Sequence, residues 1–92
     1  MLNVEELRQE YVKDKERVVF IYNRSQLAVD SDKYLLQYYK TIFGNTEYRE
    51  DTIKRAGRSL RHRFPDRFIR GAEKKNLDED LTQLNIEVFA GG

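Results

Sequence analysis

The clearest helical pattern in the chain lies in Asp51-Thr-Ile-Lys-Arg-Ala-Gly-Arg-Ser-Leu-Arg-His-Arg-Phe64. Its apolar and small residues recur at the spacing of one helix face, and they are Ile53, Ala56, Gly57, Leu60 and Phe64. Cationic side chains fill most of the remaining positions, namely Lys54, Arg55, Arg58, Arg61, His62 and Arg63. We therefore expect a helix with one face on the core and the other face available to a polyanion. A solvated, arginine-rich surface helix is the alternative.

Charge is distributed unevenly along the chain, although the net charge is only +1. Residues 49–75 contain ten Lys or Arg and four acidic residues, whereas the remainder contains seven basic and twelve acidic residues. An acidic remainder would orient the basic part toward a polyanion and limit indiscriminate binding. The pattern therefore favours double-stranded DNA as a partner despite the nearly neutral total.

Length and composition narrow the classes of protein that this chain can belong to. Its 92 residues predict a single domain over residues 1–92. With no Cys and one His, neither a disulfide nor a histidine-based metal site is expected. The acidic run Asp78-Glu79-Asp80 would not converge on a metal ion, because consecutive helical residues point in different directions. Without a phosphate-binding glycine loop or a nucleophile–base pair, we expect no catalytic residues, no cofactor and no enzymatic activity.

Hydropathy gives no indication of a membrane protein. No run approaches the roughly 18 apolar residues of a membrane-spanning helix. The first residues, Met1-Leu-Asn-Val-Glu-Glu6, lack the basic start and apolar segment of a secretory signal. We therefore expect a cytoplasmic protein with no membrane partner.

Hydrophobic spacing predicts several short helices. The first covers about residues 4–14 and is capped by Asn3. Residues 33–43 are apolar around most of the helix and should form the central one, ended by Gly44 in a left-handed conformation. The basic helix of residues 51–64 should stop before Pro65, after which Phe68 and Ile69 return to the core. Residues 72–84 predict an acidic amphipathic helix with residues 78–80 facing outward.

Two short segments leave the secondary structure open. Val18-Val-Phe-Ile-Tyr22 is β-branched or aromatic throughout, which favours a strand, yet residues 18, 21 and 22 also share a helix face. Ile86-Glu-Val-Phe89 alternates and predicts a short strand or an extended tail. If residues 18–22 and 86–89 paired, the fold would be α+β with a minor two-stranded element. Otherwise the fold is mainly α-helical, and a helix is the preferred interpretation of residues 18–22.

The order of the helices over residues 33–43 and 51–64 is that of a helix-turn-helix unit, whose second helix enters the major groove of DNA. The connection from Gly44 to Glu50 is longer than the three or four residues of the tightest version. Gly57 on the inner face would let a neighbouring helix approach closely, although glycine costs about 1 kcal/mol of helix propensity.

The segments Asp30-Ser-Asp-Lys-Tyr-Leu-Leu-Gln-Tyr-Tyr39 and Asp51-Thr-Ile-Lys-Arg-Ala-Gly-Arg-Ser-Leu-Arg61 carry a resemblance. Over about residues 30–64 the chain resembles small uncharacterised helix-turn-helix-like proteins of phages and mobile elements in Gram-positive bacteria. The resemblance implies a helix-turn-helix-like centre in which Ile53 and Leu60 are core residues. It also implies that Lys54, Arg55, Arg58 and Arg61 face outward, and that the segment before the motif is helical. Tyr39 stands where that pattern has Trp, and Gly57 where it often has Arg.

The candidate nucleic-acid-binding residues are Lys54, Arg55, Arg58, Arg61, His62, Arg63, Arg67 and Arg70. Arg58 could pair with guanine edges while residues 63, 67 and 70 contact phosphates. We expect non-enzymatic binding of double-stranded DNA by a phage or mobile-element regulatory or accessory protein. A homodimer would match a palindromic site. The alternative is a small phage-type inhibitor of a host protein or ribonucleoprotein, such as a nuclease or a CRISPR effector.

Overall fold

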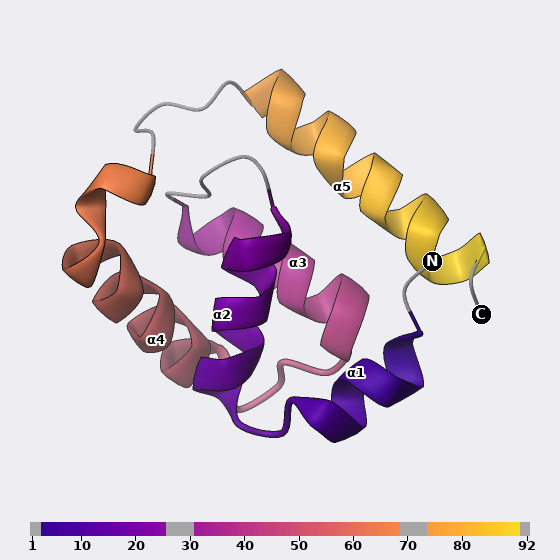
Figure 1. The fold of residues 1–92 in the computed structure, drawn as a ribbon, viewed down its shortest axis with the longest axis horizontal. Coiled ribbons are helices and arrows are strands. Elements are labelled where there is room, and N and C mark those ends of the chain that lie inside the picture. The colour runs from indigo at the N-terminus through magenta and orange to yellow at the C-terminus, as the bar shows by residue number, and fades with distance from the viewer. Residues whose placement is uncertain (1–2, 26–30, 69–73, 91–92) are drawn as a thin grey trace.

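The computed structural model describes residues 3–25, 31–68 and 74–90, and within these ranges all regular structure is helical. The α-helices are α1 (Val4–Glu10), α2 (Asp14–Arg24), α3 (Asp32–Phe43), α4 (Glu50–Arg63) and α5 (Lys74–Ala90) (Figure 1). A single 3-10 turn, η1 (Pro65–Arg67), follows α4. The prediction of a mainly α-helical fold is therefore confirmed.

Helix α3 is the centre of the core. It packs against α1, α2, α4 and α5 (Figure 1). Its buried side chains occupy about half of its circumference, and they are Tyr34, Leu35, Tyr38, Tyr39, Ile42 and Phe43. The predicted central position is confirmed, because α3 contacts each of the other four described α-helices. It ends at Gly44 with φ 84° and ψ −141°, so φ is positive as expected but ψ lies outside the left-handed helical region.

Helix α1 ends earlier than the sequence predicts. It stops at Glu10, and α2 begins only at Asp14. Arg17 explains the break, because its Nε donates to the carbonyl oxygen of Tyr11 at 2.6 Å and its Nη1 donates to the Tyr39 hydroxyl at 3.0 Å. A helix end leaves carbonyl groups without partners, and this guanidinium supplies a donor. The predicted Asn3 cap is present, with its Oδ1 accepting from the Glu6 amide at 3.2 Å.

Both segments with an open assignment are helical. Residues 18–22 lie inside α2, where Val18, Ile21 and Tyr22 are buried, so the preference for a helix is confirmed. The expectation of a strand or extended tail at residues 86–89 is wrong, because they form the last turns of α5. Val88 continues the buried side of that helix, whereas Ile86 and Phe89 are exposed. A period of about four residues, not two, therefore decides this segment.

Polar contacts fix α5 on the rest of the protein. Asp80 accepts hydrogen bonds from the Tyr38 hydroxyl, from Ser25 Oγ at 3.3 Å and from Arg24 Nη1 at 3.4 Å. Arg24 Nη2 also donates to Glu87 at 2.8 Å, about two turns further along α5. The expectation that residues 78–80 all face outward is thus wrong for Asp80. The Asp80 carboxylate, which the sequence pattern places on a solvated face, instead holds α5 against α2 and α3.

Candidate nucleic-acid interface

Helix α4 has one buried and one exposed face, as the sequence predicts. Ile53, Gly57 and Leu60 are buried against α2 and α3, and Ala56 is partly buried. Lys54 is also half-buried. The exposed positions include four basic residues, namely Arg55, Arg58, His62 and Arg63. In Figure 1, α4 lies at one edge of the protein, beside α2.

Gly57 permits the close packing of α4. A Cβ atom at this position would lie 2.4 Å from Leu35 Cδ2 and 2.8 Å from the Tyr22 hydroxyl oxygen. Both distances are shorter than non-bonded carbon and oxygen atoms allow. The predicted role of Gly57 as a site of close approach is therefore confirmed. Glycine lowers the helix propensity of α4, but it allows this basic helix to pack closely against α2 and α3.

Arg61 does not face outward, contrary to expectation. Its side chain is 17% exposed, its Nη1 donates to the Tyr22 hydroxyl at 2.9 Å and its Nη2 donates to Asp32 Oδ1 at 2.7 Å. Burial by itself lowers the pKa of Arg61, but the Asp32 and Tyr22 oxygens outweigh that effect and the pKa is raised. Arg61 is therefore a permanently charged link between three helices. Because it occupies a flank of the helix, periodicity alone could not assign it to one face.

Arg58 shares the same carboxylate. Its Nε and Nη2 donate to Asp32 Oδ2 at 3.1 and 2.7 Å, although the side chain is 67% exposed. Burial raises the pKa of Asp32, but the hydrogen bonds and charges of Arg61 and Arg58 outweigh it, and the pKa lies below its ordinary 3.8. The Asp32 carboxylate thus forms ion pairs with two of the predicted DNA-binding arginines, Arg58 and Arg61. The exposed pair adds little stability, since exposed ion pairs contribute about 0–1 kcal/mol.

The remaining candidates extend the basic surface past the end of α4. The Arg63 guanidinium lies 5.5 Å from the centre of the Phe64 ring, and Arg67 Nη2 donates to Asn23 Oδ1 at 3.2 Å. Both arginines are exposed. Phe68 returns to the core as predicted, where its ring meets that of Tyr22 edge to face at 4.9 Å. Ile69 and Arg70, for which the sequence predicts a core contact and a phosphate contact, lie outside the described residues.

The acidic helix α5 does not neutralise these cations through any ion pair among the described residues. Asp80 and Glu87 bind Arg24 of α2, and Asp78 accepts a hydrogen bond from the Tyr34 hydroxyl at 3.2 Å. The competing carboxylate comes instead from Asp32, which is 26 residues from Arg58 in the chain. Sequence reasoning missed this role, because no spacing rule connects residues so distant. The acidic residue at the start of α3 was the only available signal.

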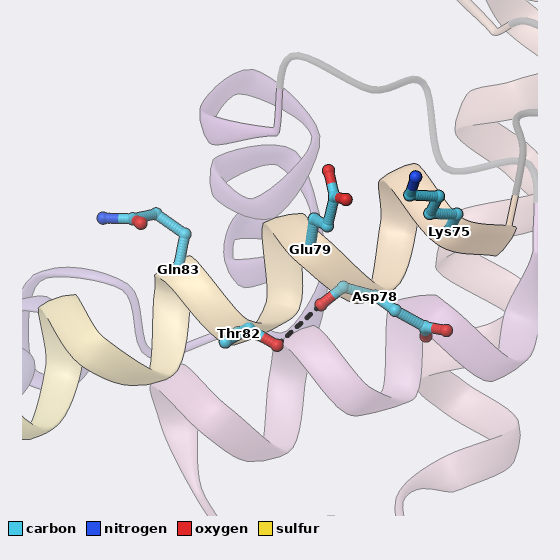
Figure 2. Close-up of a pocket in the computed structure, with 5 residues that line it drawn as sticks. All are labelled: Lys75, Asp78, Glu79, Thr82 and Gln83. Atoms are coloured by element: carbon cyan, nitrogen blue, oxygen red, sulfur yellow. Dashed lines mark hydrogen bonds between the residues drawn. The ribbon is translucent and has the colours of Figure 1, made fainter.

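A surface depression of about 570 Å³ lies along α5, away from α4. Figure 2 shows its residues, Lys75, Asp78, Glu79, Thr82 and Gln83, along a single helix. The Thr82 hydroxyl donates to the Asp78 carbonyl oxygen at 2.9 Å, which is an ordinary contact within a helix. The Asp78 and Glu79 carboxylates point in different directions (Figure 2). This depression therefore offers no convergent chemical site.

In residues 3–25, 31–68 and 74–90, no three His, Cys, Asp or Glu side chains are gathered closely enough to hold a metal ion. None of the helices described in these ranges combines the length and apolar character needed to cross a lipid bilayer. Comparison with protein-family models, with curated proteins and with solved structures gives no match. A function for this chain is therefore inferred from the geometry of α4 and its surroundings.

Proposed function

We propose that this chain binds double-stranded DNA through the exposed face of α4, without catalysing a reaction. The observation that carries the proposal is the separation of charge along that helix. The acidic residues of α4, Glu50 and Asp51, both lie in its first turn. The exposed side chains that follow are basic or carry a hydroxyl group, and they are Thr52, Arg55, Arg58, Ser59, His62 and Arg63. Such a face suits the phosphates and base edges of a duplex.

The dimensions of α4 support this proposal. Its 14 residues correspond to about 21 Å of helix, and an α-helix of about 10–12 Å diameter fits a major groove about 12 Å wide. The connection 44–49 joins it directly to α3, in the order of a helix-turn-helix unit. A regulatory or accessory role in a phage or mobile element stays the expectation from the sequence resemblance.

The positions and contacts of the basic residues suggest which of them would approach base edges and which would contact phosphates. Arg55 and His62 lie centrally on the exposed face and would approach base edges, while Arg63 and Arg67 at the far end would contact phosphates. Arg58 would have to exchange Asp32 for DNA, and Arg61 would stay in the core. With about four phosphates neutralised, log affinity should fall with log salt at a slope of about −3 to −4.

The test is a titration of a fluorescent DNA duplex followed by anisotropy at two salt concentrations. We expect binding with the stated salt slope, and the Arg55→Ala and Arg63→Ala variants should each weaken it severalfold while leaving the circular-dichroism spectrum unchanged. Lys15→Ala is the matched control, because Lys15 is an exposed cation on α2. Equal weakening by Lys15→Ala, or no binding up to about 100 µM, the weak end of non-specific DNA binding, would contradict the proposal.

A second candidate is the inhibitor that binds a host protein or ribonucleoprotein such as a nuclease or CRISPR effector. The observation that favours it is the neutralisation of Arg58 and Arg61 by Asp32, which reduces the charge available to a polyanion. The same DNA titration separates the two. An absence of DNA binding, combined with weakened capture of a defined nuclease partner by the Arg55→Ala variant, would favour the inhibitor.

A further inference from the structure

A pocket of about 220 Å³ lies where α2, the end of α4 and η1 meet. Its apolar walls include Val19, Phe64 and Phe68, and Asn23 and Arg67 stand among its polar lining residues. Val19 and Phe64 are 36% and 45% exposed, so the pocket presents apolar surface to solvent. A cavity of about 150 Å³ accommodates benzene. The pocket is therefore large enough for one aromatic ring.

The side of this pocket formed by the end of α4 and η1 is basic. Arg67 lines it directly, and the Arg63 guanidinium lies over the ring of Phe64, which forms one wall. Asp66 is the one carboxylate in the described segment 61–68. A ring that enters the pocket would thus be favoured if acidic side chains accompanied it.

The opposite end of α4 carries a segment with these properties. Tyr48, in the turn before α4, is 96% exposed. Glu47, Glu50 and Asp51 beside it are also exposed, and the neighbouring cation Arg49 contacts Asp14 at 3.6 Å. The segment therefore offers an aromatic ring surrounded by acidic side chains.

The backbone holds Tyr48 in an unfavourable conformation. Its φ of 67° makes it the one described non-glycine residue with positive φ. The turn is fixed on both sides, because Asn45 Oδ1 accepts from the Glu47 amide at 2.7 Å and the Arg49 amide donates to the Thr46 carbonyl at 2.9 Å. Thr46 is itself buried. A strained residue with a fully exposed ring costs free energy without any gain in packing, which is typical of a contact residue.

We infer that Tyr48 of one copy inserts into the pocket formed by Val19, Phe64 and Phe68 of a second copy. Tyr48 precedes the first residue of α4, whereas the pocket lies at the last turn of α4 and η1, so one chain cannot bring them together. In the contact between copies, Glu47, Glu50 and Asp51 would face Arg63 and Arg67. A contact between two different surfaces of the same chain is head-to-tail, and it extends into longer assemblies unless the rotation closes.

The test is sedimentation equilibrium of the full chain in the absence of DNA, so its result does not depend on the DNA-binding proposal. We expect the average mass of the wild-type protein to rise with concentration. Tyr48→Ala and Val19→Glu should each raise the dissociation constant at least about tenfold, equivalent to about 1.4 kcal/mol. Val19→Glu places a charge at the pocket wall, and Arg67→Glu replaces it if that variant fails to fold.

The decisive arm is a mixture of the two variants. Tyr48→Ala keeps the pocket and Val19→Glu keeps the tyrosine, so an equimolar mixture should form one-to-one dimers that grow no further. Phe89→Ala is the control, because Phe89 is an exposed aromatic residue on α5 and should have no effect. A wild-type protein that stays monomeric up to about 1 mM, a mixture that fails to dimerise, or a Phe89→Ala variant that abolishes association would overturn the inference.

Discussion

Arg61 of α4 contacts Asp32, the first residue of α3, with 2.7 Å between Nη2 and Oδ1. The same guanidinium donates to the Tyr22 hydroxyl of α2 at 2.9 Å. A mostly buried arginine requires such partners, because an unpaired charge inside a protein is strongly disfavoured. The most basic helix of the chain therefore uses one of its cations to hold α2, α3 and α4 together.

Substitution Asp32→Asn should destabilise the protein by about 1–3 kcal/mol, because it leaves the Arg61 charge without its counter-ion. Chemical denaturation monitored by circular dichroism measures this change. Asp66→Asn is the matched control, since Asp66 is exposed and outside the core, and it should change stability by less than about 0.5 kcal/mol. Equal effects of the two substitutions would mean that the pair with Arg61 contributes nothing.

Stability should depend on pH through the same carboxylate. The folded pKa of Asp32 lies below its ordinary 3.8, since Arg61 and Arg58 outweigh the effect of burial. The ionised form therefore favours folding, and its contribution is fully present above pH 3.8 and is lost as the pH falls below that value. Denaturation from pH 7 to pH 2.5, about one unit below that ordinary value, should show the difference between wild type and Asp32→Asn shrinking at the acid end. A difference that stays constant over this range would refute the assignment.

Gly57→Ala should destabilise the protein although alanine is the better helix former. The gain in propensity is about 1 kcal/mol, but the added methyl group would overlap Leu35 and the Tyr22 hydroxyl, and overpacking a core costs about 1–3 kcal/mol. Thermal unfolding gives the measurement. Ser59→Ala, on the exposed face of the same helix, serves as the comparison and should be neutral or slightly stabilising. A stabilised Gly57→Ala variant would show that α4 packs less closely.

Asp80→Asn should loosen α5, because Asp80 accepts from Tyr38, Ser25 and Arg24. Loss of its charge should cost about 1–3 kcal/mol. Hydrogen exchange of the α5 amides would show whether that helix opens before the rest of the protein. The neighbouring substitution Glu79→Gln should leave exchange unchanged, since Glu79 is exposed. Similar exchange in both variants would exclude Asp80 as the docking contact.

Tyr48→Gly should leave the protein as stable as wild type or slightly more stable. Glycine relieves a left-handed conformation that costs other residues about 1–2 kcal/mol, against an entropic loss of about 0.5–1 kcal/mol. Chemical denaturation at a protein concentration below the onset of association isolates this effect. A clear loss of stability would show that the Tyr48 ring contributes to folding and is not reserved for a partner.

Much of the helical fold could be predicted, because the spacing of apolar residues along a short segment is enough to identify an amphipathic helix. The central position of α3, the end of α4 before Pro65 and the buried Gly57 follow from side-chain pattern and backbone chemistry. Residues 86–89 were predicted wrongly because four residues are too few to separate alternation from the continuation of a helix. The ion pair between Arg24 of α2 and Glu87 of α5 joins residues far apart in the chain, so no pattern within a short segment predicts it.

The sequence predicted where the candidate interface lies, but it did not predict which basic residues belong to it. The sequence was sufficient to predict that one face of a helix over residues 51–64 is apolar and that its other positions are rich in cations, because a fixed helical period assigns residues to faces. Which cations remain available depends on the fold, since Asp32 reaches Arg58 and Arg61 from 26 and 29 residues away. An ion pair depends on distance in space, and chain folding alone sets that distance between remote residues.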